Sequence, residues 1–340
     1  MKTALITTTI NVPRVLRNYR QLDPDVRFFV AADLDTDAEA YELCDDIGNC
    51  ESIRPTVHGF LPWAPYNSIA RRNVALLEAL RWGADVIVSV DDDNIPLPPG
   101  NWVSDSYFEN FDLRLTQPYH GLSIRGQGKY TWFDVGQFLG PVAPHRGIPI
   151  DRLAAHIAFD PVVGVKVGVA AGICLGDPDI SAVTRIADHP TVHRVSEVLR
   201  AGIVVDPLVD WTVFNSQNTA IVRELAPAWM MWPCIGRYDD IMASLVVQRI
   251  ARERGYHIHF GQPFVWQQRN AHDLVGDLEG EVWGMRNVAR VAEEIDRIDL
   301  GSATTVTEQV RRIFFALEHR VPIAATEAGL SWCDAVEEVL

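Results

Sequence analysis

The chain has 340 residues, of which 48% are hydrophobic and 22% charged, and its formal net charge is −15. This length and composition suit a globular protein with a full hydrophobic core and exclude a disordered chain. The acidic balance argues against general binding to nucleic acid or to anionic membranes, because both need a positive surface.

The cysteines and the N-terminal stretch bear on the compartment. The five cysteines are scattered without any CxxC spacing: Cys44, Cys50, Cys174, Cys234 and Cys333. Such a sparse, odd set is typical of free thiols in a reducing compartment. The start, MKTALITTTINVPR, is short in its apolar part for a signal peptide, and no stretch approaches the roughly 20 apolar residues of a membrane span. We therefore expect a soluble, cytoplasmic protein without a membrane span.

The first third of the chain alternates apolar runs with helical patterns. A strand is expected from Thr3 to Ile10, after which Asn11 could cap a helix beginning at Pro13. A second buried strand, Val26 to Ala32, ends at Asp33. An Asp at such a strand end often accepts hydrogen bonds from a nucleoside, and an ordinary turn explains it equally well. The alternation predicts a doubly wound parallel sheet.

A helix is expected from Pro65 to Trp82, capped by Asn67 or Ser68 and ended by Gly83. Three polar residues occupy its N-terminal half, where an anion near the sheet edge could be met: Arg71, Arg72 and Asn73. A solvated helix face is the alternative interpretation of these side chains.

An acidic triplet follows directly. The β-branched run Val86 to Val90 stops at Asp91, Asp92 and Asp93, which predicts carboxylates at the end of a buried strand, where open α/β sheets bind ligands. Adjacent carboxylates repel one another, so they need solvent or a cation. Their hard oxygens suit Mg²⁺ or Mn²⁺. A solvated acidic turn is the alternative.

Later segments carry weaker patterns. Residues 101–149 suggest strands and a loop at the active site, and strands are expected over 162–175, 204–214 and 257–260. A short helix is expected from Asn218 to Leu225, and the tail from Asn287 onward is helical.

A second acidic cluster lies at Asp239 and Asp240, which open a helix beside Arg237 and Tyr238. Acidic residues in a first turn favour the helix dipole, and this structural role competes with a functional one. This mixture of acidic, basic and hydroxyl side chains is also what the surface beneath a bound sugar requires. His272, in RNAHD, reads as an ordinary surface histidine on composition alone.

The ordered motifs resemble known families. The block over 65–97, with TTTINVP upstream, resembles the STELLO-type glycosyltransferases. The stretches GDPDISAVTRI (176–186) and GRYDDIMASLVVQRI (236–250) resemble the reversibly glycosylated polypeptide family, which includes UDP-arabinopyranose mutases. Together these stretches span residues 3–285 and leave the helical tail unmatched.

The resemblance implies a GT-A fold, with a Rossmann-like, mostly parallel central sheet flanked by helices. It implies a nucleotide-sugar-binding and catalytic domain over residues 1–285 and a C-terminal helical extension over 286–340. In such proteins the acidic motif holds a divalent metal ion, Mn²⁺ or Mg²⁺, on the diphosphate of a nucleotide sugar.

The resemblance also implies roles for residues of this chain. Asp91 and Asp93 become the metal-binding pair, Asp92 its central member, and His272 the histidine that completes the metal shell. Contacts to the nucleotide or diphosphate fall to a larger set: Thr8, Thr9, Asn11, Asp33, Arg71, Arg72 and Asn73. The sugar or acceptor would lie over the expected catalytic residues: Asp239, Asp240 and Arg237.

The chemistry is consistent with these roles. Breaking a glycosyl–phosphate bond puts negative charge on the leaving diphosphate, which a divalent cation and arginine stabilise most in the transition state. The anomeric carbon becomes oxocarbenium-like, and a neighbouring carboxylate can stabilise or trap it.

One stretch departs from the mutase pattern. That family carries a glycosylated arginine in a segment reading roughly RGYPFSLREG, where this chain has HRGIPIDRLAAH. Arg146-Gly147 matches the start, but Arg152 is offset and lacks the following Glu-Gly. Both Arg146 and Arg152 stay open as glycosylated positions.

We therefore expect a metal-dependent glycosyltransferase that uses a UDP-sugar as donor. One alternative is a UDP-sugar mutase that interconverts pyranose and furanose rings and needs no acceptor. The other is a non-catalytic scaffold that binds a nucleotide sugar. The C-terminal helices are a possible homo-oligomer contact.

Overall fold

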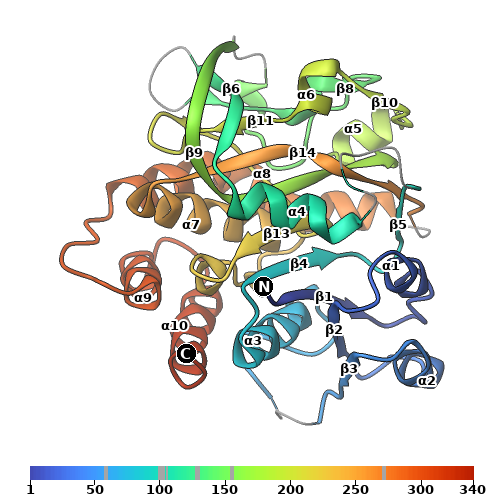
Figure 1. Cartoon of the computed structure of the whole chain (residues 1–340). Coiled ribbons are helices and arrows are strands. Elements are labelled where there is room, and N and C mark those ends of the chain that lie inside the picture. The colour runs from blue at the N-terminus through green and yellow to red at the C-terminus, as the bar shows by residue number, and fades with distance from the viewer. Residues whose placement is uncertain (57–59, 99–103, 105, 127–130, 154–156, 270–272) are drawn as a thin grey trace.

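A ten-stranded mixed sheet forms the centre of the computed structural model, with helices on both faces (Figure 1). The structure describes residues 1–56, 60–98, 104, 106–126, 131–153, 157–269 and 273–340. The strand order is β3-β2-β1-β4-β13-β9-β6-β11-β14-β5, and two further sheets of two strands each join β10 to β8 and β12 to β7.

The elements have the following bounds. The strands are β1 (Thr3–Thr9), β2 (Arg27–Ala32), β3 (Cys50–Ile53), β4 (Val86–Val90), β5 (Asn94–Pro96), β6 (Tyr119–Gly126), β7 (Thr131–Trp132), β8 (Leu139–Gly140), β9 (Ile157–Gly176), β10 (Arg194–Val195), β11 (Ile203–Val205), β12 (Asp210–Trp211), β13 (Asn218–Val222) and β14 (Tyr256–Gln267). The α-helices are α1 (Leu16–Leu22), α2 (Ala38–Ile47), α3 (Arg72–Trp82), α4 (Tyr107–Thr116), α5 (Ala182–Ala187), α6 (Glu197–Ala201), α7 (Asp239–Arg254), α8 (Leu274–Arg297), α9 (Val306–Ala316) and α10 (Ile323–Glu337). Short 3-10 helices are η1 (Ile69–Arg71), η2 (Val135–Phe138), η3 (Ile150–Arg152) and η4 (Ala226–Ala228).

The N-terminal half of the sheet is parallel. β3, β2, β1 and β4 run in one direction, and every residue of β4 is buried, as its continuous apolar run predicts. Ser68 accepts a hydrogen bond from Ala70 N at the start of η1, which leads into α3, and α3 ends at Gly83 with φ 84°. The expected α/β architecture with a central sheet between helices is confirmed.

The second half of the sheet mixes both directions. β13 is antiparallel to β4 and to β9, whereas β14 is parallel to β9 and β11 is parallel to β6. The parallel arrangement expected from the sequence therefore extends through β4, and the strands beyond it follow a mixed pattern.

Three local predictions were wrong. The segment from Asn218 is strand β13 rather than a helix, because its run Thr-Ala-Ile-Val fills the buried place between β4 and β9. The single strand expected over 204–214 is divided into β11 and β12. Asn11 caps no helix, since α1 begins at Leu16 with Val15 at the capping position.

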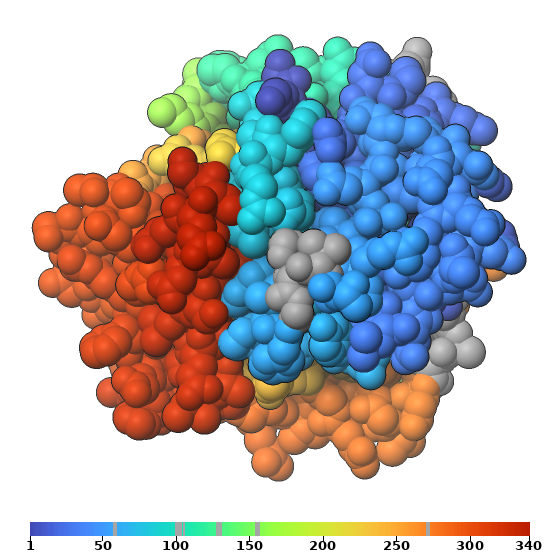
Figure 2. Space-filling model, turned by 90° about the horizontal axis from the view of Figure 1, so that it is seen from below, coloured from blue at the N-terminus to red at the C-terminus, as the bar shows by residue number. Residues whose placement is uncertain are grey.

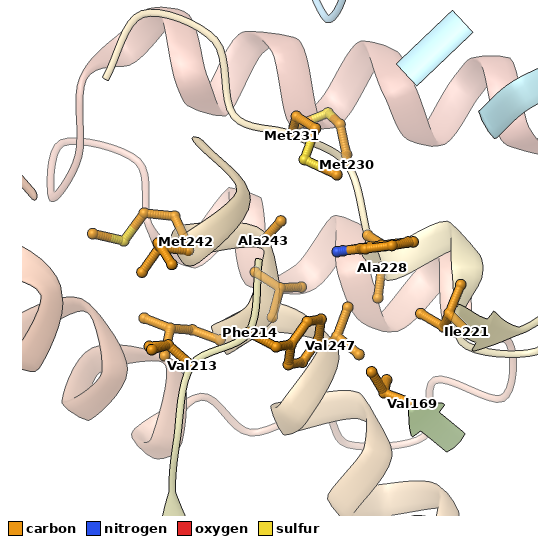
Figure 3. Close-up of a cluster of buried hydrophobic side chains, with 14 of the residues drawn as sticks. Val169, Val213, Phe214, Ile221, Ala228, Met230, Met231, Met242, Ala243 and Val247 are labelled. Atoms are coloured by element: carbon orange, nitrogen blue, oxygen red, sulfur yellow. The ribbon is translucent and has the colours of Figure 1, made fainter. Parts of the chain in front are cut away.

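Helix α7 is the centre of the larger core. Val247 of α7 lies beside Phe214 and near the side chains of Val169 on β9 and Ile221 on β13, and Met242 and Ala243 of α7 belong to the same buried cluster (Figure 3). Residues 239–251 of α7 are all buried, so this helix is fixed between the sheet and the C-terminal helices. A rigid α7 fixes the position of the two aspartates that open it.

The three C-terminal helices share this core. Trp332 on α10 stacks edge-on against Trp63 with ring centroids 5.2 Å apart, and its Nε1 donates to the Pro227 carbonyl oxygen at 2.8 Å. Phe314 on α9 packs against Trp232 at 5.2 Å. Figure 2 shows α10, in dark red, lying against the cyan segment that contains α3. Helix α8 runs without a break across residues 285 and 286.

The cysteines differ from the expected set of free thiols. Cys44 near the end of α2 and Cys50 at the start of β3 form a disulfide, with Cα atoms 5.3 Å apart. Gly48 and Asn49 adopt positive φ angles of 64° and 48°, which turn the chain back and bring the two cysteines together. Thus the cysteine argument for a reducing compartment is lost, although the other three cysteines are free.

Within the described ranges, no helix combines the length and the apolar character needed to cross a membrane.

Candidate functional site

A cavity of about 730 Å³ lies at the carboxyl ends of β1, β2 and β4, opposite the first turn of α7. This edge of an open α/β sheet is where ligands bind. Most of the predicted site residues line it: Thr8, Thr9, Asn11, Asp33, Arg72, Asp91, Asp92, Asp93, Arg237, Asp239 and Asp240. The fold therefore brings together two acidic clusters that are far apart in the sequence.

Two predicted residues lie elsewhere. Arg71 is fully buried and donates to the backbone oxygens of Ala32 and Ala64, at 3.3 and 3.1 Å. Asn73 is also buried, and its Nδ2 donates to the backbone oxygens of Trp63 and Met231. Both side chains hold loops onto α3 and neither lines the cavity, which corrects the expectation that they face a nucleotide. His272, the predicted third metal ligand, lies outside the described residues.

The acidic triplet surrounds one corner of the cavity. Asp91 Oδ1 accepts from Arg72 Nη2 at 2.5 Å, and Asp92 Oδ2 accepts from the Thr9 hydroxyl at 2.5 Å. Burial raises the pKa of Asp92, and burial together with repulsion from Asp91 and Asp92 raises the pKa of Asp93 to about 7. The triplet thus concentrates more negative charge than its protein partners neutralise.

This donor set suits a divalent cation in its chemistry but is incomplete as a metal cage. In the described part of the chain, no group of three or more His, Cys, Asp or Glu side chains is arranged to hold a metal ion. Asp91 and Asp93 offer hard carboxylate oxygens to the cavity, and the raised pKa of Asp93 reflects charge that a cation would offset. The residues therefore fit Mg²⁺ or Mn²⁺ when other oxygen ligands come from the substrate and from water.

The corner of the cavity where the sequence predicts a nucleoside is built from β1 and β2. Thr8 Oγ1 donates to the Ala31 carbonyl oxygen at 2.8 Å, which ties the two strand ends together. Asp33 is buried, and its carboxylate accepts from the backbone N–H groups of Leu34 and Ser68, at 2.7 and 3.3 Å. Asp33 is thus held in place by the loop that precedes α3.

Asp239 and Asp240 form the opposite wall and have different environments. Asp240 Oδ2 accepts from the Ser216 backbone N–H at 3.1 Å, and its Oδ1 accepts from Arg146 Nη2 at 3.1 Å. Asp239 Oδ1 accepts from the Asp240 N–H at 2.9 Å. Burial, followed by repulsion from Asp240, raises the pKa of Asp239 to about 7. Asp240 is therefore a fixed ion-pair partner, whereas Asp239 is the carboxyl group that can change its protonation near neutral pH.

Arg146 is the centre of a buried ion-pair network. Its Nε and Nη2 donate to the two carboxylate oxygens of Asp179 at 2.7 and 3.0 Å, and its Nη1 donates to the Arg237 carbonyl oxygen. Burial alone would raise the pKa of Asp179, but the Arg146 guanidinium together with His145 and Arg269 outweighs it and holds that pKa well below its ordinary value. Asp179, in the GDPD stretch, therefore stays ionised and fixes Arg146 under the cavity.

The two arginines left open by the sequence have different positions. Arg146 lines the cavity and is 6% exposed. Arg152 lies on η3, and its half-exposed side chain pairs with Asp151 at 3.4 Å. Of the two, Arg146 is the one beside the aspartates of α7.

Arg237 connects the cavity to α8. Its Nη1 lies 3.1 Å from Asp277 and its Nε lies 3.7 Å from Glu281, both on α8. Its backbone N–H donates to the Gly280 carbonyl oxygen at 3.0 Å. These contacts fix the turn before α7 and place Arg237 at the cavity wall.

Several lining residues were not predicted. They include Ser216 and Gln217 before β13, Trp232 and Cys234 before α7, Gln267 at the end of β14 and Arg269 after it. Ser216 and Gln217 were missed because their segment was read as leading into a helix rather than into a central strand. Arg269 precedes the predicted His272 in the same RNAHD stretch, so that motif could have indicated it.

Comparison with known proteins gives a distant relative. No family model matches the chain. The chain is similar to the probable UDP-arabinopyranose mutase 1 of Pisum sativum, with 24% identity over 198 residues. That alignment covers 52% of this chain and 51% of the relative, so the chain matches about half of the relative's length. The expected resemblance to the mutase family thus has an aligned counterpart, whereas the resemblance to STELLO-type proteins stays a prediction.

Among solved structures, the chain is similar to S. aureus TarS. The structure of TarS 1–349 in complex with UDP-GlcNAc gives a TM-score of 0.43 at 11% identity, covering 100% of this chain and 90% of that chain. A longer TarS structure gives a TM-score of 0.41 at 10% identity and covers 94% of this chain and 43% of that chain.

Proposed function

We propose that the chain is an enzyme that binds a UDP-sugar in this cavity and transfers its glycosyl group with the help of a divalent metal ion. The observation that carries the proposal is the meeting of the Asp91–Asp93 triplet with Asp239 and Asp240 across one cavity. One cluster suits the diphosphate side of a nucleotide sugar, and the other suits its sugar ring. The distant mutase relative, whose name includes a UDP-sugar, supports this choice of substrate class.

The metal would belong to the triplet. Asp91 and Asp93 would hold Mg²⁺ or Mn²⁺, and the bound ion would stabilise negative charge on the leaving diphosphate. Arg72 orients Asp91 through its 2.5 Å contact and adds positive charge at the same corner. Thr9 in turn holds Asp92 through its 2.5 Å hydrogen bond.

The sugar would lie over the first turn of α7. As an ionised carboxylate, Asp239 would stabilise positive charge at the anomeric carbon. Asp240 is held by Ser216 and Arg146, so its role is to position the turn and to keep Arg146 in place. The raised pKa of Asp239 places its ionisation near neutral pH, where transfer would be sensitive to pH.

A mutase reaction is the second candidate, favoured by the aligned relative. It would use the same cavity but would return the glycosyl group to the same diphosphate. Self-glycosylation at Arg146 would require freeing a nitrogen from its contacts with Asp179, Asp240 and the Arg237 carbonyl oxygen. The cavity would therefore serve a mutase as well, but Arg146 is engaged in ion pairs and is not free to carry a sugar.

The test is to incubate the purified protein with a panel of UDP-sugars and Mn²⁺, without acceptor, and to identify products by mass spectrometry and NMR. Slow release of UDP and free sugar, stopped by a chelator, would support the transferase and name its donor. A ring-rearranged nucleotide sugar would establish the mutase instead. Binding without any turnover, with or without added acceptors, would favour a scaffold. If the protein neither binds nor converts any UDP-sugar of the panel, the proposal is wrong.

A further inference from the structure

The end of β14 forms a corner of the cavity that the sequence-based roles leave unassigned. Gln267, the last residue of β14, and Arg269 both line the cavity. The Gln268 N–H donates to the Asp93 carbonyl oxygen at 3.3 Å, and Gln267 Nε2 lies 3.5 Å from Asp93 Oδ1. Arg269 therefore enters the cavity beside the acidic triplet.

The Arg269 guanidinium is buried and has unused donors. Its side chain is 8% exposed, and within the described part of the chain its Nε and Nη2 make no hydrogen bond. A guanidinium carries five N–H donors and stays protonated at all relevant pH values. Buried donors are costly when they lack an acceptor, and native proteins rarely leave them so. An acceptor from a bound ligand would remove this cost.

The other arginines that line the cavity are already paired with carboxylates of the chain. Arg72, Arg146 and Arg237 each form an ion pair at 3.1 Å or less with a carboxylate of the chain. Among the lining arginines that the structure describes, Arg269 alone has a buried terminal nitrogen without a hydrogen bond. It is therefore the arginine best able to turn toward a ligand.

Among the described residues, Arg269 has one ion pair, which is long and replaceable. Its Nε lies 3.4 Å from Asp177 Oδ2. Asp177 also pairs with Arg185, whose Nη1 donates to Oδ1, and with His189 Nε2 at 3.3 Å. Asp177 thus keeps two partners if Arg269 shifts, and the shift would leave no carboxylate unpaired.

The charge of the cavity indicates what Arg269 would bind. Seven carboxylates line the cavity: Asp33, Asp35, Asp91, Asp92, Asp93, Asp239 and Asp240. A diphosphate would be repelled here unless cations faced it. Arginine pairs with phosphate through parallel N–H···O bonds. Within the described part of the chain, Nε and Nη2 of Arg269 make no hydrogen bond, and the long contact of Nε with Asp177 could be exchanged for such a pair.

We propose that Arg269 binds the diphosphate of the nucleotide sugar, on the side of the triplet formed by Asp93. This inference rests on the proposed function, because it takes a nucleotide diphosphate as the ligand. It adds a binding residue that works alongside the cation of the triplet, and it assigns Asp177 the role of holding Arg269 ready before substrate arrives.

The test compares UDP with uridine, which lacks the phosphates, by calorimetry and competition at fixed Mg²⁺. The variants are Arg269→Met, which keeps the length of the side chain and removes its charge, and Arg269→Lys. Arg185→Met is the matched control, since Arg185 pairs with the same Asp177 but does not line the cavity. Thermal melting confirms that each variant is folded.

We expect Arg269→Met to lower the affinity for UDP by about tenfold or more, because it removes a charge-assisted pair. The uridine affinity should stay unchanged, Arg269→Lys should fall between, and Arg185→Met should bind UDP as the wild type does. Equal UDP affinity in Arg269→Met and wild type would overturn the inference. An equal loss of uridine affinity would also overturn it, as would an equal loss of UDP affinity in Arg185→Met, since both would show a structural role.

If Arg269→Met does not fold, the test uses Arg269→Lys, and wild-type UDP affinity in that variant contradicts the bidentate contact. Failure of wild-type protein to bind UDP would instead remove the proposed function.

Discussion

Arg72 on α3 donates to the hydroxyl and the backbone oxygen of Ser216, at 2.5 and 3.1 Å, across the floor of the cavity. The same guanidinium contacts Asp91, and Ser216 in turn donates to Asp240. This chain of hydrogen bonds joins the two acidic clusters, so that a shift of a side chain in one cluster affects the position of the other. Arg72 is central to the site because its buried guanidinium contacts both Asp91 and Ser216.

Arg72→Lys should reduce turnover by about tenfold or more, because a single ammonium cannot reach Asp91 and Ser216 together. Steady-state kinetics with the donor found in the UDP-sugar panel would measure this. Arg71→Lys is the control, since Arg71 donates to the backbone oxygens of Ala32 and Ala64, lies over the Tyr66 ring and does not line the cavity. Equal losses in both variants would mean that Arg72 acts through stability alone.

Asp239→Asn should lower turnover by about 100-fold, because an amide cannot stabilise positive charge at the sugar. The UDP affinity should change little. The pKa of Asp239 is raised to about 7, so the active carboxylate form is present above this pH and is lost as the pH falls below it. Wild-type turnover should therefore decline from pH 8 to pH 6. The residual turnover of Asp239→Asn should decline less steeply, because only the other carboxyl group with a pKa of about 7, that of Asp93, still changes its protonation in this range.

The control for this variant is Asp35→Asn, which removes an exposed carboxylate at the other side of the cavity. It should retain both turnover and the pH profile. A wild-type level of turnover in Asp239→Asn would assign Asp239 to helix capping instead.

Gly284→Ala should destabilise the protein by about 1–3 kcal/mol, as overpacking of a filled core does. A Cβ at Gly284 on α8 would lie 2.0 Å from the Tyr238 ring, directly before Asp239. The variant should also lose activity, because the displaced ring moves the start of α7. Gly280→Ala is the control, since its Cβ would meet the flexible side chain of Arg237 at 3.3 Å. Urea unfolding of both variants would decide, and equal free energies of unfolding would contradict the account.

Trp332→Ala should cost about 3–5 kcal/mol of unfolding free energy, because it removes a fully buried aromatic side chain. It also leaves the Pro227 carbonyl oxygen without its donor. Trp332→Phe should lose less. Denaturant unfolding would measure the loss. A single transition lowered in midpoint would show that the C-terminal helices unfold with the rest of the chain, whereas an unchanged transition would make them an independent unit.

The sequence predicted those features whose signals are local. The buried run of β4, the aspartates after it, the Ser68 start and the Gly83 end all lie in one continuous stretch, and all were confirmed in position. The same holds for Asp239 and Asp240 at the first turn of α7.

What the sequence left undetermined depends on partners distant in the chain. Arg71 and Arg72 are adjacent and identical in type, and only the packing of α3 decides that one holds a loop and the other lines the cavity. Arg146 could not be paired with Asp179 and Asp240 before the fold brought them together. The strand β13 was mistaken for a helix for the same reason, since its buried place in the sheet outweighs its local pattern.

The central claim is that the acidic triplet and the aspartates of α7 form one UDP-sugar site. The most direct test is calorimetric titration of UDP, with Mg²⁺ or Mn²⁺, into the wild-type protein and the Asp91→Asn/Asp93→Asn variant. Thermal melting must show that the variant is folded, because Asp91→Asn removes the charge that faces the buried Arg72 guanidinium. We expect metal-dependent binding to the wild type and a loss of affinity of about 100-fold in the variant, as expected for loss of charged metal ligands. Equal affinity in the two proteins, or binding that ignores the metal, would contradict the account.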